Sequence, residues 1–256
     1  MAITPKIAAV SYLNTIPFIY GIEHEGNFSA ELLLCTPAKC AEAYRNGDVD
    51  IALVPAASVP TLPLAEVVGD FCIGAQGAVR TVVLLSDDPI DQVKRIFADT
   101  HSRTSVQLAG YLAKNHWNIN PEWYTLDDMK QLAHAKDGDA FLLIGDKVFE
   151  HEDEFDYTYD LSEEWEAATS LPFAFAVWVA RKGTPYEVID ALEQALEFGV
   201  EHTYEAILEY RNDGSTVESY EYLTKNIDFL FDMQKRQALK KFWDAGIKIE
   251  PKSNPG

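Results

Sequence analysis

The amino-acid sequence predicts an α/β protein whose mostly parallel sheets are flanked by helices. Apolar runs of strand length alternate with helical stretches, and the first such unit reads strand, helix, strand. Hydrophobic residues make up 47% of the 256 residues and charged residues 24%. Such a chain can bury a substantial core without disulfides or metals, and its length suits one large domain or two lobes.

The first strand–helix–strand unit is predicted in the N-terminal quarter. Residues 7–10 and Glu31–Cys35 are short apolar runs typical of strands. The Thr36–Pro37 pair predicts a helix start, because Thr can cap a helix and Pro is preset for its first turn. The helix should end at Gly47, and residues 50–54 then form a buried strand. This order implies a parallel sheet.

The middle of the chain continues the alternation. Residues 72–85 predict one long strand with a bend near its two glycines. Residues 102–115 predict a helix, in which leucines spaced four apart share one face. Residues 140–144 and 173–180 predict two further buried strands.

The remaining segments complete the expected fold. Thr184–Pro185 predicts the start of a long helix with Val188 and Leu192 on its apolar face. Residues 215–245 read as helical throughout, and the acid-rich segment 150–166 reads as a solvated surface loop.

The formal charge of −20 excludes one class of partner. Nucleic-acid binders need a basic face, and the 41 acidic residues outnumber the 21 basic ones without any basic run. The acid excess is typical of a soluble protein, and an anionic ligand would need local hydrogen-bond donors. We expect a cytoplasmic protein that binds no membrane. The three cysteines are scattered, and the sequence shows neither a signal-peptide pattern nor an apolar run long enough to span a membrane.

Common catalytic motifs are absent from the sequence. It contains no HExxH, Walker loop, GxGxxG after a strand or GxSxG. Its six histidines are scattered, so we expect no dedicated metal site. Cys40 falls on a helix face beside Ala41 and Tyr44, where a buried structural thiol is the simplest interpretation.

Small polar residues follow several predicted strands, where ligands bind in open α/β sheets. These positions are Ser11–Asn14, Pro55–Ser58, Ser86, residues 102–105 and Gly145–Asp146. Each has a structural alternative. The hydroxyls of Ser102, Thr104 and Ser105 can cap a helix or bind an anion at its start. Asn14 or Thr15 can cap a helix, and Asp146 can form a turn. Arg80 can be a surface charge or can bind a carboxylate through two N–H groups of its guanidinium.

Six motifs occur in this order along the chain: SYLNTIPF, GDVDIALVPAAS, CIGAQGAVRTVVLLS, SRTSVQLAGYL, LLIGD and DLSEEW…TSLPFAFAVW. Motifs of this kind occur in the same order in a known family, and the sequence resembles that family, the chorismate dehydratases of the futalosine route of menaquinone biosynthesis. The resemblance covers roughly residues 7–182.

The resemblance implies a two-lobed fold of the type II periplasmic-binding-protein class, with the ligand cleft between the lobes. Residues 1–88 and 178–256 would form one lobe and residues 89–177 the other. It implies no metal or cofactor. The implied reaction removes water from chorismate to give 3-[(1-carboxyvinyl)oxy]benzoate, a step that aromatises the ring and so needs mainly orientation and electrostatics from the enzyme.

The resemblance also assigns roles to individual residues. Asn14 in SYLN matches the family's functional asparagine, and Thr81 stands where many members have serine, so both are expected to be catalytic. Ser170 stands where glycine is usual. From the strand ends and the family motifs together, we expect the substrate-binding residues to be Ser11, Pro55, Ala56, Arg80, Ser102, Thr104, Ser105, Gly145 and Asp146.

An amide or an alcohol is a poor proton acceptor near neutral pH. We therefore expect no general base on the protein, and our hypothesis is that a carboxylate of the substrate takes the proton. Two alternatives stay open. The chain could be a cytoplasmic binding protein for a small carboxylate, or the sister enzyme that makes 1,4-dihydroxy-6-naphthoate, although an Asp–Thr pair would be expected there in place of Leu13–Thr15. A scaffold role has little support.

Overall fold

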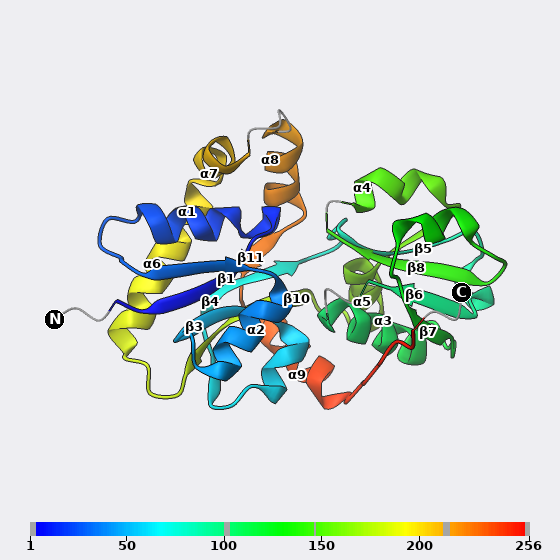
Figure 1. The fold of residues 1–256 in the computed structure, drawn as a ribbon, viewed down its shortest axis with the longest axis horizontal. Helices are drawn as coiled ribbons and strands as arrows, with labels where there is room; N and C mark the ends of the chain where they lie inside the picture. The colour runs from blue at the N-terminus through cyan, green and yellow to red at the C-terminus, as the bar shows by residue number, and fades with distance from the viewer. Residues whose placement is uncertain (1–3, 100–102, 146, 212–215, 254–256) are drawn as a thin grey trace. The chain divides into compact units, whose positions relative to one another are not determined.

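The computed structural model describes residues 4–99, 103–145, 147–211 and 216–253 and is drawn as a ribbon in Figure 1. The chain forms two compact units, each built from two separate stretches of sequence. The first unit contains Met1–Ala75 and Ala174–Met233, and the second contains Gln76–Phe173 and Gln234–Gly256.

The first unit is built on a six-stranded mixed sheet with the order β11-β4-β10-β3-β1-β2. Strand β1 pairs in parallel with both β2 and β3, whereas β10 pairs antiparallel with β3, and β11 pairs antiparallel with β4. The strands are β1 (Lys6–Val10), β2 (Glu31–Cys35), β3 (Ile51–Pro55), β4 (Ala65–Ala75), β10 (Phe173–Arg181) and β11 (Asp228–Leu230).

Helices cover both faces of this sheet. Every residue of β3 is buried, as expected for a strand with helices on either side. Because parallel crossovers are right-handed, the steps from β1 to β2 and from β2 to β3 place α1 and α2 on opposite faces (Figure 1). The helices are α1 (Ile16–His24), α2 (Pro37–Asn46), α6 (Tyr186–Glu201), α7 (Thr203–Tyr210) and α8 (Thr216–Lys225), with 3-10 helices η1 (Leu13–Thr15) and η2 (Ala56–Thr61).

Two glycines let α1 and α6 approach closely. A Cβ atom added to Gly21 of α1 would lie 1.9 Å from the carbonyl oxygen of Ala195 in α6, and one added to Gly199 of α6 would lie 1.9 Å from that of Pro17 in α1. At that separation the two helix backbones would have to move apart. Residues without a side chain are therefore required on both helices at this crossing.

The second unit is built on a five-stranded mixed sheet with the order β7-β6-β8-β5-β9. Strand β6 pairs in parallel with β7 and β8, and β5 pairs antiparallel with β8 and β9. The strands are β5 (Val82–Ser86), β6 (Arg95–Ala98), β7 (Glu122–Thr125), β8 (Asp139–Ile144) and β9 (Tyr157–Asp160).

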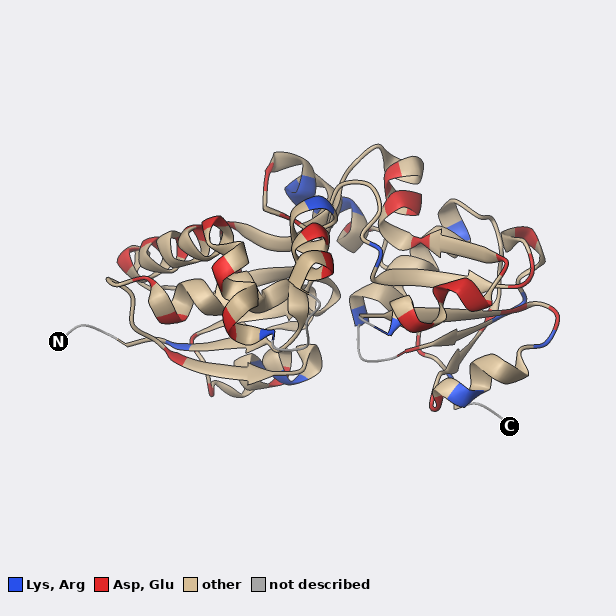
Figure 2. Cartoon of the chain, turned by 90° about the horizontal axis from the view of Figure 1, so that it is seen from above, with Lys and Arg blue, Asp and Glu red and all other residues tan. Residues whose placement is uncertain are grey.

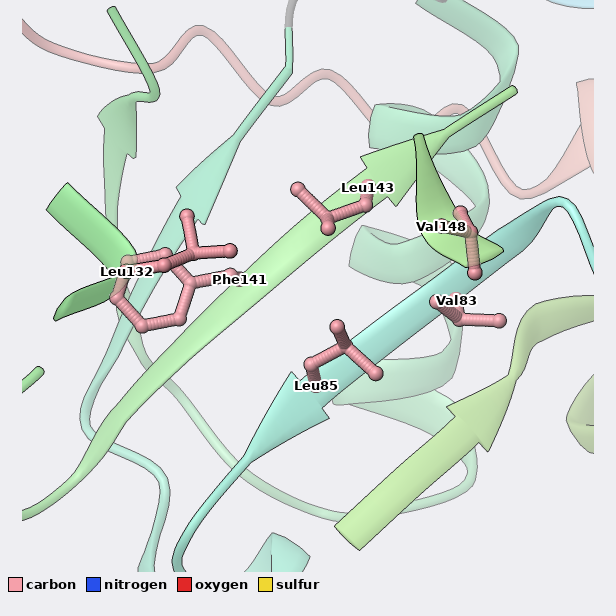
Figure 3. Packing of buried hydrophobic residues seen from close by; sticks show 6 residues of the cluster. All are labelled: Val83, Leu85, Leu132, Phe141, Leu143 and Val148. Atoms are coloured by element: carbon pink, nitrogen blue, oxygen red, sulfur yellow. The ribbon is translucent and has the colours of Figure 1, made fainter. Parts of the chain in front are cut away.

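Alternate residues of the second sheet face two different layers. Figure 3 shows one face, where Val83 and Leu85 of β5 lie beside Phe141 and Leu143 of β8. Val148 and Leu132, from segments outside the sheet, complete this cluster. Helices α3 and α5 contact β8 and β5 and lie on the other side (Figure 1). The helices are α3 (Arg103–Asn115), α4 (Val148–His151), α5 (Leu161–Thr169) and α9 (Met233–Asp244), with 3-10 helices η3 (Ile90–Gln92), η4 (Met129–His134) and η5 (Glu152–Glu154).

The C-terminal segment belongs to the second unit because its contacts are there. Phe242 of α9 packs edge-on against the buried rings of Trp165 and Phe173. The side-chain amide of Gln107 in α3 donates to the Ile249 carbonyl and accepts from the Ile249 N–H, at 2.9 and 2.8 Å. These bonds tie residues 234–253 to α3 and α5.

The α/β class predicted from the sequence is confirmed, although both sheets are mixed rather than mostly parallel. The units also differ from the expected lobes of 1–88 with 178–256 and 89–177. Strand β5 pairs only within the second sheet among the described pairings, which moves the first crossing upstream to residues 75–76. The aromatic contacts of α9 assign residues 234–256 to the second unit.

Three local predictions were wrong. Residues 72–85 are not one strand: β4 ends at Ala75 and β5 begins at Val82, in the other sheet. Residues 215–245 are not helical throughout, because β11 interrupts them and pairs with β4. Residues 150–166 are not a solvated loop, since they contain β9 and α5 with the fully buried Trp165.

The close approach of α1 and α6 gives a stability test. Gly21→Ala should lower the free energy of unfolding by at least about 1–3 kcal/mol, because the new methyl group overlaps the α6 backbone. Gly26→Ala is the matched control, since a Cβ there meets nothing within 4 Å. Urea unfolding of both variants measures the difference, and equal midpoints would contradict the close-approach account.

Candidate functional site

Strand directions bring several polar residues to one edge of the second sheet. Strands β6 and β8 run in parallel, with Ala98 paired to Leu142, so both end at this edge. Strand β5 runs the other way and begins there, with Val82 paired to Ile144. The residues next to these strand ends are therefore neighbours: Thr81, Asp99 and Gly145.

Thr81 is fixed at this edge by its backbone. Its side chain is buried, and its carbonyl oxygen accepts a hydrogen bond from the Gly145 N–H at 2.8 Å. Gly145 has a φ of 79°, a left-handed conformation that favours glycine and turns the chain out of β8. Two expected site residues from different strands, Thr81 and Gly145, thus lie in direct contact.

The start of α3 supplies the hydroxyl groups predicted from the sequence. Thr104 and Ser105 lie in the first turn of this 13-residue helix and are buried, with 0% and 1% of their surfaces exposed. Helix N-termini favour negative charge through their N–H groups and dipole. Ser102 and Asp146, which the sequence also selected, lie outside the described residues.

An ion pair at the same edge was missed in the sequence. Asp99 follows β6 directly and is buried, and its carboxylate is bound by the Nζ of Lys147, two residues beyond Gly145. Burial lowers the pKa of the Lys147 ammonium from its usual value. The short apolar run of β6 was the signal that could have pointed to Asp99, because polar residues after strands marked the other candidates.

Arg80 is neither an unpaired surface charge nor a guanidinium without a carboxylate partner. Its Nη2 lies 3.0 Å from the Glu152 carboxylate, and its guanidinium lies over the Phe149 ring at 5.1 Å. The side chain is half exposed, so this pair contributes little to stability. The carboxylate that Arg80 binds in this structure therefore belongs to the protein itself.

Asp160 holds the backbone leading to Thr81. Its Oδ2 accepts from the Arg80 N–H at 2.6 Å, and its Oδ1 caps α5 by accepting from the Ser162 and Glu163 N–H groups. Burial raises the pKa of this carboxyl, and the backbone hydrogen bonds oppose that shift. The bond to Arg80 secures a residue in the left-handed region, with a φ of 65°.

In the first unit, the ends of β1 and β3 place three expected residues at one sheet edge. Ser11 follows β1 and is exposed, and its N–H donates to the Cys35 carbonyl at 3.1 Å. Pro55 ends β3, and the fully buried Ala56 begins η2. Because β1 and β3 are parallel, these residues share the carboxyl edge of the sheet.

Asn14 lies in η1, just beyond Ser11, and is half-buried. Its Oδ1 accepts from the Thr15 hydroxyl at 3.2 Å. Thr15 precedes α1 as its N-cap residue, yet neither η1 nor α1 has a side-chain cap hydrogen bond. The capping role considered for Asn14 and Thr15 is therefore not the role seen in the structure, and the Asn14 amide keeps hydrogen-bonding capacity for a ligand.

Two other sequence observations have structural explanations. Ser86 lies at the opposite end of β5, where its hydroxyl donates to the Asp139 carbonyl and accepts from the Asp88 N–H, so it does not join the edge that holds Thr81. Ser170 follows α5 with a φ of 57°, a left-handed conformation that favours glycine, the residue that the family resemblance implies at this position.

Acidic residues are spread over both units. Figure 2 shows Asp and Glu along the helices and loops of each unit, with Lys and Arg among them. Among the described residues, no helix combines the length and the apolar character needed to cross a bilayer.

One cluster in the described residues has metal-ligand character. Glu23, His24 and Glu209 place one potential ligand atom each within 4.8 Å, and all three are exposed. His24 Nε2 lies 3.1 Å from the Glu209 carboxylate, and the Tyr210 hydroxyl donates to Glu23. These groups already bind one another at the exposed surface of α1 and α7.

The fold belongs to the periplasmic-binding-protein class. A Candida albicans gene product, CA3427, described as having the generic periplasmic binding protein fold, matches with a TM-score of 0.64 at 15% identity, covering 97% of this chain and 92% of its own. The aliphatic sulphonate binding protein SsuA of Escherichia coli matches with a TM-score of 0.63 at 11% identity, covering 100% and 95%. Protein AF1704 of Archaeoglobus fulgidus reaches 0.73 at 16% identity, covering 94% and 96%.

Residues 5–247 match the model of the menaquinone biosynthesis family, and the chain belongs to that family. A curated relative, the chorismate dehydratase of Thermus thermophilus, is 27% identical over 268 aligned positions, covering 95% of this chain and 96% of its own. The family resemblance noted in the sequence and the expected fold type are thereby confirmed.

The contacts of Asp160 predict its effect on stability. Asp160→Ala should cost about 1–2 kcal/mol for the lost helix cap and about 1–3 kcal/mol for the unsatisfied Arg80 N–H. Asp128→Ala is the control, because Asp128 caps the short η4 through one exposed bond to Lys130. Chemical denaturation compares the two, and a loss at Asp160 no larger than at Asp128 would contradict the assigned role.

Proposed function

We propose that this protein is a chorismate dehydratase that acts in the cytoplasm and forms 3-[(1-carboxyvinyl)oxy]benzoate. The observation that carries the proposal is the 27% identity to the Thermus thermophilus chorismate dehydratase along nearly the whole of both chains. The contacts of the candidate residues are compatible with that activity. No metal or cofactor is part of the proposal.

The reaction divides into two bond changes. A proton leaves the ring carbon that bears the enolpyruvyl ether, and the neighbouring hydroxyl departs, so that one water is lost and the ring becomes aromatic. We assign Asn14 and Thr81 to hold the reacting groups. An amide both donates and accepts hydrogen bonds, so Asn14 can bind the leaving hydroxyl or a substrate carboxylate.

A dianionic substrate needs local donors in a protein of charge −20. Thr104 and Ser105 in the first turn of α3 offer hydroxyls near the positive end of a helix dipole. Lys147 adds one ammonium at this sheet edge, although Asp99 balances its charge. We therefore assign one substrate carboxylate to the start of α3.

Two acidic residues at this edge have other partners. Asp99 binds Lys147, and Asp160 accepts hydrogen bonds from backbone N–H groups. Their engagement supports the hypothesis that a substrate carboxylate, held in place by Asn14 and Thr81, takes the ring proton. Asp146 is the residue that tests this step: if Asp146→Asn abolished turnover without weakening chorismate binding, an enzyme carboxylate would be the base.

Incubation with chorismate separates an enzyme from a binding protein of the same fold. The purified protein should consume chorismate and release the carboxyvinyloxy-benzoate, detected by absorbance and mass spectrometry, and it should do so with a chelator present. Stable binding of chorismate without conversion would mean that the chain is a receptor. Neither binding nor conversion would refute the proposal altogether.

Replacement of Asn14 tests its catalytic assignment. Asn14→Asp keeps the shape but adds a negative charge next to an anionic substrate, and Asn14→Ala removes donor and acceptor together. Each should lower kcat by about 30- to 1000-fold, equivalent to about 2–4 kcal/mol of lost transition-state stabilisation, with a nearly unchanged Tm.

The control for Asn14→Asp is Asn46→Asp, which makes the same chemical change at an exposed position at the end of α2. It should leave turnover intact. A stable Asn14→Asp protein with normal activity would overturn the assignment of Asn14.

A further inference from the structure

Two of the three cysteines lie in contact at the end of β2. Cys35 is the last residue of this strand, and Cys40 lies in the first turn of α2. Their Sγ atoms are 3.1 Å apart, and both are free thiols. The Cys40 N–H donates to the Thr36 carbonyl at 3.0 Å, so the helical turn fixes the position of Cys40 relative to the strand end.

We propose that Cys35 and Cys40 form a site of reversible oxidation, at which a peroxide converts the two thiols into an intramolecular disulfide. The proposal is independent of the catalytic activity assigned above. It rests on the contact between the two sulfur atoms and on the unequal exposure of the two side chains.

The geometry needs only a small adjustment. A disulfide places its sulfur atoms about 2.0 Å apart, so the two Sγ atoms must close by about 1 Å. Rotation of the side chains can supply much of this movement because the strand end and the helix start are already adjacent. Cys35 is connected to the sheet by its pairing with Val10, which limits how far the backbone moves.

Exposure assigns a different step to each cysteine. Cys35 is partly exposed and meets the oxidant first, whereas Cys40 is buried. The Cys35 thiolate attacks one peroxide oxygen and becomes a sulfenic acid, with hydroxide leaving. The Cys40 sulfur then attacks the Cys35 sulfur and water leaves, so that two thiols and one hydrogen peroxide give one disulfide and two waters.

Burial raises the pKa of the Cys40 thiol, with a further contribution from its hydrogen bond to Cys35. The raised pKa slows the second step, because the thiolate is the attacking species. The contact between the sulfur atoms compensates in part, since the attack is intramolecular.

The oxidation site adjoins the segment that leads to Asn14. The Cys35 carbonyl accepts the hydrogen bond from the Ser11 N–H, and Ser11 is separated from Asn14 by two residues. Disulfide formation therefore restrains a backbone segment that is bonded to the start of this loop.

Peptide mapping of the full-length protein tests the proposal directly. After exposure to hydrogen peroxide under native conditions, the protein should lose two of its three reactive thiols on denaturation and a mass equal to two hydrogen atoms. Trypsin cleaves after Lys39, which separates the two cysteines, so the disulfide should join two peptides that dithiothreitol releases.

Two cysteine variants test whether the disulfide forms between Cys35 and Cys40. Cys72→Ser is the matched control, because Cys72 is a buried thiol of the same unit whose Sγ contacts the Asp228 and Leu230 carbonyls. It should form the disulfide as the wild type does, and Cys35→Ser should not. Wild-type protein that accumulates only sulfenic or sulfinic acid at Cys35, or that links Cys72 or a second chain instead, would overturn the proposal.

Discussion

Parallel pairing of neighbouring strands is the constraint on which the candidate site depends. In the first sheet it aligns the ends of β1 and β3, and in the second it aligns the ends of β6 and β8. Residues 40 or more positions apart in sequence are thereby placed at one edge: Ser11 with Ala56 in one unit, and Asp99 with Gly145 in the other. The antiparallel β5 adds Thr81 to the second edge because it starts where its partner ends.

Charge is the second constraint on function. In a strongly acidic protein, an anion binds more readily where nearby acidic groups already have partners, and two such groups at the second edge do. Asp99 is paired with Lys147, and the buried Asp160 accepts backbone hydrogen bonds that also hold the residue before Thr81. These two carboxylates therefore have partners other than the first turn of α3, which we assign to a substrate carboxylate.

Local signals predicted those elements whose ends are marked by particular residues. Pro37 and Gly47 correctly predicted the two ends of α2. The fixed φ of proline and the left-handed conformation of glycine are local effects that act within a few residues. The sequence did not predict that the chain crosses from the first unit to the second after Ala75. Which sheet β5 joins depends on its pairing partners β8 and β9, which lie far along the sequence. In the sequence, nothing distinguished Asp160 from the other acidic residues of its segment, since its burial arises from the packing of α5. Asn14 was marked both by the end of a predicted strand and by a family motif, whereas Thr81 was marked by a family motif alone, and the function assigned to them stays a prediction.

A crystal structure with the carboxyvinyloxy-benzoate product bound tests the central claim most directly, because it shows which residues contact the ligand. The account predicts that the product contacts Asn14 and Thr81 and that one of its carboxylates accepts hydrogen bonds from the first turn of α3, at Thr104 and Ser105. A product bound elsewhere on the chain, or bound without contact to Asn14 and Thr81, would contradict the assignment of these residues as the catalytic site.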